Sequence, residues 1–231
     1  MNEHIVKSYE DELNSLTAET ARMGGLTESL IADSLAAVVK RNQELAAQVV
    51  VRDEKLDEAE RDIERKAIRL VALRQPVADD LRRAVAAMKV ANNLERCGDL
   101  AKNIAKRTLV IIETDPLTPL TRAIERMGKL VLGRLSSVLD AYTRSDLERA
   151  LAVWSQDDEV DEHYNALFRE LLTYMMGDPR TITACAHMLF VAKNLERIGD
   201  HATNIAEIVH YQITGEDMIA PVRPKTDALS A

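Results

Sequence analysis

The sequence is poor in aromatic residues and in cysteine. Aromatic side chains make up 3 % of the 231 residues, although apolar residues make up 46 %. A core of this composition consists mainly of Leu, Val, Ile, Ala and Met, which is typical of helix packing, because strands draw more heavily on aromatic residues. The two cysteines, Cys97 and Cys185, have no CxxC spacing. They therefore predict no disulfide framework and indicate a reducing compartment.

The sequence also lacks long apolar runs and an excess of positive charge. No stretch approaches the ~20 apolar residues of a membrane span, and the N-terminal MNEHIVKSYEDEL has no signal-peptide core. The 38 acidic and 30 basic residues give a net charge of −8, which argues against nucleic acid as a partner. We therefore expect a cytoplasmic protein. The densest basic group alternates with acids and is interpreted as a solvated helix face: Arg61, Arg65, Lys66, Arg69 and Arg74.

Motifs of common catalytic sites are missing as well. The chain contains no G-x-x-x-x-G-K-[ST] phosphate cradle, no H-E-x-x-H zinc motif and no G-x-S-x-G nucleophile elbow. The chemistries that depend on these motifs can therefore be set aside, and no catalytic residue is predicted from them.

Apolar residues recur at three- and four-residue steps almost throughout the chain, which predicts an all-α fold. Pro76, Pro119 and Pro179 are interpreted as helix starts, since proline is tolerated in the first helical turn. Residues suited to cap a helix N-terminus occur at four places: Asn42, Thr118, Ser145 and Asp178. Six helices are predicted, at 4–41, 43–74, 77–113, 119–143, 146–176 and 179–213.

One sixteen-residue segment occurs twice. Twelve of the sixteen residues in 90–105 are identical to those in 191–206, including N-L-E-R-x-G-D. The repeat places three helices in each half, and short connections favour antiparallel neighbours. We therefore predict two three-helix bundles in tandem, at 1–115 and 116–214. The polar segment 215–231, with two prolines, is predicted to be disordered.

The repeated segment carries a pair of carboxylates one helical turn apart, which brings two like charges together on one face. The pairs are Glu95 with Asp99 and Glu196 with Asp200. The preceding long helix of each half has the same spacing, in Asp53 with Asp57 and Asp157 with Asp161. We expect the two pairs of each half to face one another on an accessible surface.

Two interpretations of these acids remain open at this point. Carboxylates that converge from adjacent helices are hard oxygen ligands and could hold a cation without histidine or thiolate. Alternatively, Arg96, Arg197 and other bases neutralise them in ion pairs between helices. Gly98 and Gly199 lie inside both repeats at a cost of about 1 kcal/mol each relative to alanine, which indicates close helix approach or access to the carboxylates.

The repeated segments NNLERCGDLAKNIA and KNLERIGDHATNIAE resemble the signature of the PhoU family. Three further stretches agree with it: MGGLTESLIADSL, RQPVADDLR and LLTYMMGDPRTI. The resemblance extends from about residue 4 to residue 215, and the length is that of a free-standing member rather than of a domain attached to a transporter.

This resemblance implies a cytoplasmic, non-enzymatic and usually homodimeric negative regulator of the phosphate-starvation response. Such a protein connects the ATPase subunit of the phosphate ABC transporter to a membrane sensor histidine kinase, and reaches the membrane only through these partners. The resemblance also implies that iron or zinc, or another divalent cation, could bind the E(D)-x-x-x-D motifs. The alternative function is a carboxylate-cluster metalloprotein that binds or stores metal, with Glu95, Asp99, Glu196, Asp200, Asp53, Asp57, Asp157 and Asp161 as ligands.

Overall fold

The fold is all-α, as the sequence predicts. The computed structural model describes residues 2–218, with side chains from residue 10 onward, and these residues form helices and connecting turns without strands. Within this range no helix is both long enough and apolar enough to cross a membrane. The elements are α1 (Asn2–Lys40), α2 (Gln43–Arg52), α3 (Glu54–Arg74), α4 (Ala78–Ile111), α5 (Thr118–Arg144), α6 (Leu147–Ser155), α7 (Asp158–Gly177), the 3-10 turn η1 (Pro179–Thr181) and α8 (Ile182–Thr214).

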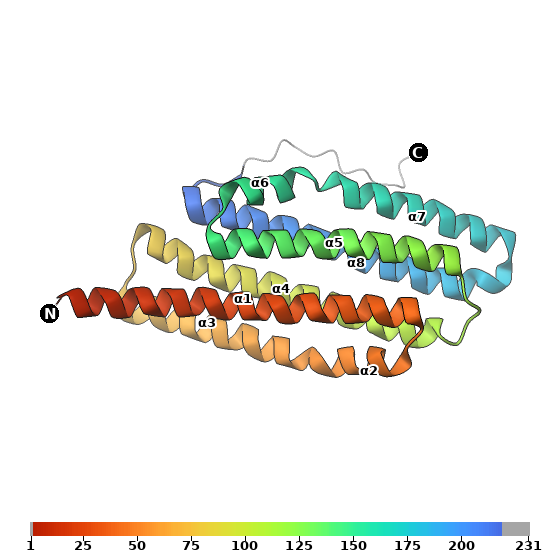
Figure 1. Cartoon of the computed structure of the whole chain (residues 1–231), viewed down its shortest axis with the longest axis horizontal. Coiled ribbons are helices and arrows are strands. Elements are labelled where there is room, and N and C mark those ends of the chain that lie inside the picture. The colour runs from red at the N-terminus through yellow and green to blue at the C-terminus, as the bar shows by residue number, and fades with distance from the viewer. Residues whose placement is uncertain (1, 219–231) are drawn as a thin grey trace.

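The helices form two elongated three-helix bundles that lie side by side (Figure 1). The first bundle contains α1, α4 and the pair α2–α3, and the second contains α5, α8 and the pair α6–α7. The two bundles meet where α4 packs against α8 and α1 packs against α5. Their buried apolar residues form one continuous cluster, so a single core runs through both repeats.

Two glycines allow α1 and α5 to approach closely. A Cβ atom on Gly24 would lie 2.8 Å from Cδ1 of Leu139, and one on Gly128 would lie 2.5 Å from Cδ1 of Leu35. Such distances are shorter than van der Waals contact, so a larger residue would require the facing leucine side chain or the helices to shift. Gly24 and Gly128 follow a methionine in both repeats, and the contacts they make are reciprocal, as expected of a duplicated unit.

The predicted helices at 43–74 and 146–176 are each interrupted, which corrects the sequence-based expectation. The first is divided at Asp53, and the second at Gln156 and Asp157. Neither aspartate caps the helix that follows it. Aspartate is a poor helix former because its carboxylate competes with the backbone for partners. Here each carboxylate bonds instead to a side chain of the third long helix of its bundle, at Lys102 or Thr203.

Two of the four predicted caps are correct. Asn42 accepts a hydrogen bond from the backbone N–H of Leu45, and Asp178 accepts one from that of Arg180. The prediction for Ser145 is wrong, because this residue ends α5 in the left-handed region at φ 51°. Asp146 caps α6 instead.

Other helix ends differ by a residue or two from prediction. Thr118 is the first residue of α5 rather than its cap, and Pro76 lies two residues before α4 begins at Ala78. The predicted last helix opens with η1 and becomes α-helical only at Ile182. Most of the predicted disordered tail, at 219–231, lies outside the described residues.

Candidate acidic sites

Each bundle contains the four carboxylates that the sequence groups together. The first acidic site comprises Asp53, Asp57, Glu95 and Asp99, at the junction of α2 and α3 with the middle of α4. The second acidic site comprises Asp157, Asp161, Glu196 and Asp200, at the junction of α6 and α7 with the middle of α8. The break in each long helix places its first aspartate at the turn, where the carboxylate reaches the facing helix.

The first acidic site contains a lysine. Lys102 Nζ lies 2.6 Å from Oδ2 of Asp53 and 3.4 Å from Oδ1 of Asp99, so one ammonium group links carboxylates from two elements. Asp53 is 1 % exposed, which corrects the expectation that all four acids lie on an accessible face. Burial raises the pKa of Asp53, and the hydrogen bond from Lys102 opposes that rise. The buried charge is therefore stabilised from within the protein.

Gly98 makes room for this arrangement. A Cβ atom on Gly98 would lie 2.3 Å from Cδ2 of Leu56 and 3.1 Å from Oδ1 of Asp53. The repeat position Gly199 is less confined, since its Cβ would lie 3.3 Å from Cγ1 of Val160. Close helix packing against the acidic site thus explains the glycine in the first repeat, and explains it less fully in the second.

The second acidic site has a different partner at the position of Lys102. The equivalent residue is Thr203, whose hydroxyl donates a hydrogen bond of 2.7 Å to Oδ1 of Asp157. A cation enters from another position, because Lys193 Nζ lies 2.5 Å from Oε1 of Glu196. The residue equivalent to Lys193 in the first repeat is Asn92. The lysine of the third long helix therefore comes three residues after the carboxylate pair in the first repeat and three residues before it in the second.

This exchange leaves the second site with more repulsion between carboxylates. Burial, followed by the charges of Glu196, Asp157 and Asp161, raises the pKa of Asp200 to about 6. Burial and then Glu196 also raise the pKa of Asp161. In addition, Oε2 of Glu196 is buried and has no hydrogen-bond partner among the described residues. Additional positive charge would therefore stabilise this site.

In the first site, the pKa of Glu95 is also raised. Burial, followed by Asp99, raises the pKa of Glu95, and Arg96 opposes the rise. Arg96 Nε lies 3.6 Å from the carboxylate of Glu95, its neighbour in sequence, and Arg197 forms no ion pair among the described residues. An ion pair between elements does neutralise an acid here, but the base is Lys102 at Asp53 rather than either of the two arginines named from the sequence.

The arrangement of carboxylates falls short of a metal site as it stands. Within residues 10–218, no three Asp, Glu, His or Cys side chains converge closely enough to hold a metal ion. The donors are nevertheless carboxylate oxygens from two elements, which is the chemistry that hard cations require. A cation in either site would need these carboxylates to move closer together, and in the first site it would also compete with Lys102.

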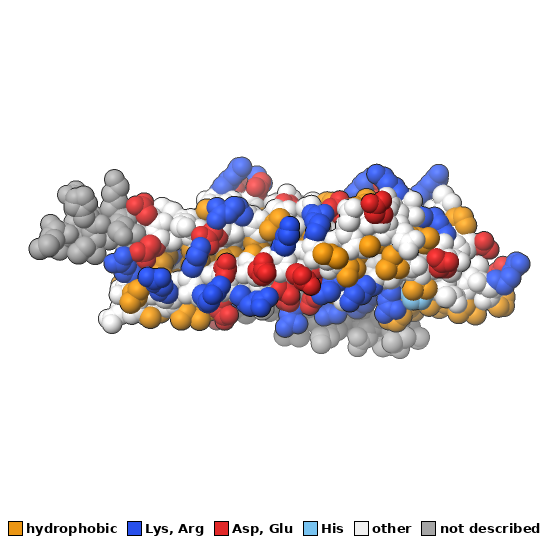
Figure 2. All heavy atoms as spheres, turned by 90° about the horizontal axis from the view of Figure 1, so that it is seen from below, with side chains coloured by type: hydrophobic (Ala, Val, Ile, Leu, Met, Phe, Trp, Pro, Cys, Tyr) orange, Lys and Arg blue, Asp and Glu red, His pale blue; other side chains and the backbone are white. Residues whose placement is uncertain are grey.

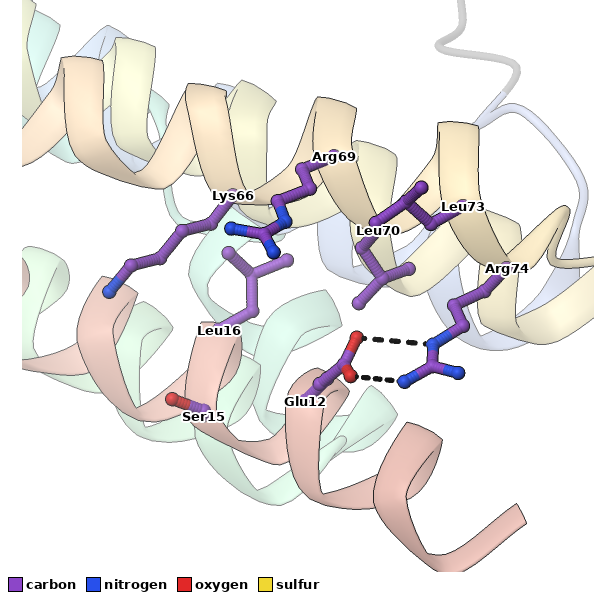
Figure 3. A pocket seen from close by; sticks show the side chains of 8 residues that line it. All are labelled: Glu12, Ser15, Leu16, Lys66, Arg69, Leu70, Leu73 and Arg74. Carbon is purple, nitrogen blue, oxygen red and sulfur yellow. Dashed lines mark hydrogen bonds and ion pairs between the residues drawn. The ribbon is translucent and has the colours of Figure 1, made fainter. Parts of the chain in front are cut away.

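The basic group on α3 does more than face solvent. Arg74 donates hydrogen bonds to both carboxylate oxygens of Glu12 on α1, at 2.6 and 3.5 Å (Figure 3). Lys66 reaches both oxygens of Glu19, each at 2.6 Å. Basic and acidic side chains alternate over the face that α3 forms (Figure 2). The interpretation as a solvated face therefore misses the two ion pairs that join α3 to α1.

The fold and the sites together define the class of this protein. It is an all-helical protein of two tandem three-helix bundles, each with an acidic site between its long helices. The sequence matches the family model of the PhoU domain at residues 20–108 and 124–209. The chain therefore belongs to the PhoU family. The two matched ranges lie within the two predicted repeats.

Full-length relatives and solved structures resemble the chain throughout. It is 67 % identical, over 230 residues and all of both chains, to the "Phosphate-specific transport system accessory protein PhoU homolog" of Caulobacter vibrioides. It is 36 % identical over 217 residues to the Escherichia coli "Phosphate-specific transport system accessory protein PhoU", covering 94 % of this chain and 90 % of that one. The crystal structure of PhoU from Pseudomonas aeruginosa superposes with a TM-score of 0.84 at 36 % identity, over 90 % of this chain and 100 % of that chain.

Sequence reasoning found the eight acids and missed the residues that distinguish the two sites. Lys102 and Lys193 each occupy one of the four positions at which the aligned repeats differ. A comparison of those differences, rather than of the identities, would have indicated that the two sites carry different charge.

Proposed function

We propose that this chain is a negative regulator of phosphate uptake and of the phosphate-starvation response, and that it works as an adaptor rather than as an enzyme. The observation that carries the proposal is the 67 % identity over the whole chain to a relative named as a phosphate-specific transport system accessory protein. In this role the protein is cytoplasmic and homodimeric. It contacts the ATPase subunit of the phosphate ABC transporter and the sensor histidine kinase that reports phosphate status.

A deletion strain tests the regulatory role. Removal of the gene should leave a phosphate-starvation reporter active in phosphate-rich medium, and a plasmid-borne copy should silence it again. The adaptor role is tested by co-purification of the tagged protein with the transporter ATPase from membranes at high and low phosphate. A silent reporter in the deletion strain, in the absence of a second gene copy, would refute the regulatory proposal.

A second candidate function is the binding of a divalent cation, iron or zinc among them, at the second acidic site. It is supported by the exchange of Lys102 for Thr203, by the buried and unpartnered Oε2 of Glu196, and by the raised pKa of Asp200. Asp157, Asp161, Glu196 and Asp200 would hold the ion. In the first acidic site, the ammonium of Lys102 already supplies the positive charge.

Elemental analysis after saturation with iron or zinc tests this second function. The parent protein should retain metal, Asp200→Asn should lose it, and Asp99→Asn should retain it as a matched control from the first site. The absence of bound metal in the parent would refute the proposal. Equal loss in both variants would refute the assignment to the second site alone.

A further inference from the structure

A surface on the second bundle is rich in apolar side chains that the core does not use. The chain has only two phenylalanines, Phe168 and Phe190. Neither is fully buried: Phe168 is half-buried, and Phe190 is 52 % exposed. Large aromatic side chains are strong contributors to protein interfaces, and a chain this poor in them would gain core stability by burying them. Their place at the surface therefore needs an explanation.

Further exposed or half-buried apolar side chains lie on the same two helices. On α7, Tyr164, Phe168, Leu172 and Met176 recur every four residues, so they follow one side of the helix. The rings of Tyr164 and Phe168 are 6.4 Å apart between centroids. We call the set that lies on α7 and α8 the α7–α8 apolar surface, and it comprises Tyr164, Phe168, Leu172, Met176, Ile182 and Phe190.

Contacts between helices join this surface to α8 and to α4. Lys193 of α8 lies over the ring of Tyr164, with Nζ 5.3 Å from the centroid. Phe190 is one turn before Lys193 on α8, and the guanidinium of Arg107 on α4 lies 4.3 Å from the centroid of its ring. The surface thus extends over the half of α7 and α8 that includes η1, at the end of the molecule near the α4–α5 connection (Figure 1).

Its exposure is substantial. Two arginines lie beside it, whereas Tyr164 at one end of the α7 row adjoins Lys193 and Glu196 of the second acidic site. Met176 is 84 % exposed, and Leu172 and Ile182 are also exposed. Arg107 forms no ion pair among the described residues, and neither does Arg169, which lies one turn before Leu172 and Thr173 on α7. A partner that covers the apolar side chains would therefore gain further by bringing carboxylates to these guanidinium groups.

We propose that the α7–α8 apolar surface binds an amphipathic helix of a partner protein, with apolar residues at three- and four-residue steps and acidic residues beside them. The stacking of Arg107 on Phe190 holds the ring in place before binding, which reduces the entropy cost of association. A second copy of this chain fits less well, because an isologous contact would bring the same surface, with Arg107 and Arg169, against itself. The inference deepens the proposed adaptor role and rests on it for its biological meaning.

Peptide binding by the purified full-length chain tests the inference. The probe is a fluorescent synthetic helix with leucines at three- and four-residue steps and glutamates on both sides of the leucine stripe, measured by anisotropy. A scrambled peptide of the same composition and a peptide with lysine in place of glutamate serve as comparisons. We expect the parent protein to bind the acidic amphipathic peptide more tightly than either.

The variants are Phe190→Ser and, independently, Leu172→Ser, with Ile68→Ser as the matched control. Ile68 is 53 % exposed on α3, so its replacement changes an equally exposed apolar residue in the other bundle. Loss of an aromatic interface residue should weaken binding about tenfold or more, whereas Ile68→Ser should leave it unchanged. Circular dichroism establishes that each variant is folded, and either surface variant alone suffices for the comparison.

Several outcomes would overturn the proposal. One is equal binding of the acidic and scrambled peptides, and another is unchanged binding by both Phe190→Ser and Leu172→Ser. If sedimentation shows a dimer that Phe190→Ser dissociates, the surface belongs to the contact between copies of this chain. If the parent ignores the peptide and binds vesicles of phosphatidylglycerol, the surface is a lipid contact. The peptide could fail to bind while the phosphate-starvation reporter is active in the deletion strain. That result would refute the proposed binding surface but not the regulatory function.

Discussion

At the residue scale, equivalent glycines of the two repeats have different functions. A Cβ atom added to Gly98 would lie closer to Leu56 and Asp53 than normal contact, whereas one added to Gly199 would meet only Val160, at 3.3 Å. We expect Gly98→Ala to lower the free energy of unfolding by about 1–3 kcal/mol, because Leu56 is buried and must move within a packed core. Gly199→Ala should change it by less than about 1 kcal/mol.

Urea denaturation checks this prediction, and Gly133→Ala supplies the control. A Cβ atom on Gly133 meets nothing within 4 Å, and the residue lies inside α5. Its replacement should stabilise the protein by up to about 1 kcal/mol through helix propensity alone. If Gly98→Ala behaved like Gly133→Ala, the close packing described at the first acidic site would be wrong.

The raised pKa of Asp200 gives the second site a pH dependence. A carboxyl group whose pKa rises from 3.8 to about 6 on folding binds its proton more tightly in the folded state. Its contribution to stability is therefore complete below about pH 4 and is lost as the pH rises through about 6. Thr203→Lys should place an ammonium where Lys102 lies in the first site, lower the pKa of Asp200 and reduce this loss.

Carboxyl NMR titration of Asp200 in the parent and in Thr203→Lys measures both parts of this prediction. The reverse exchange, Lys102→Thr, serves as the comparison for the first site. It removes the cation from the buried carboxylate of Asp53, so we expect a loss of roughly 2–4 kcal/mol of stability near neutral pH. An ordinary pKa for Asp200 in the parent would contradict the crowding of carboxylates described here.

At the element scale, the junction between α5 and α6 depends on two adjacent residues with opposite roles. Ser145 has φ 51°, a region that favours glycine, and the side chain of Asp146 accepts a hydrogen bond from the backbone N–H of Arg149. We expect Asp146→Ala to cost about 1 kcal/mol through loss of the cap. Ser145→Gly should instead stabilise the protein by a few tenths to about 1 kcal/mol by relieving strain. Thermal unfolding of the two variants distinguishes these roles, and a loss of stability in Ser145→Gly would restore Ser145 as the cap.

Contacts between helices also explain why two predicted helices are broken. Hydrophobic periodicity continues through Asp53 and Asp157, so the sequence indicates unbroken helices at 43–74 and 146–176. The interruptions arise because each aspartate bonds across to the facing helix, at Lys102 and Thr203, which lie 49 and 46 residues away along the chain. A local pattern contains no information on such a distant partner. The duplicated spacing of the acids singled out Asp53 and Asp157 as candidate site residues, but it predicted no break at either.

At the scale of the whole molecule, the two repeats share one core, and we expect them to unfold together. Trp154, the only tryptophan, lies in α6 of the second repeat, so its fluorescence reports on that half alone. Circular dichroism reports on the helices of both repeats. The urea transitions measured by the two methods should coincide. An earlier fluorescence transition would show that the second bundle unfolds independently, contrary to the continuous packing of α4 against α8.

The sequence by itself determined the helical class, the duplication and the eight acids, because these depend on composition, periodicity and repeated spacing along the chain. Only the tertiary structure decided that Asp53 is buried, that Lys102 neutralises the first site while the second keeps its crowded carboxylates, and that neither phenylalanine is fully buried. Whether a charged side chain is buried, and which group pairs with it, depends on contacts between helices that are far apart along the chain. Two repeats that share twelve of sixteen residues in their acidic segments therefore acquire sites with different electrostatics.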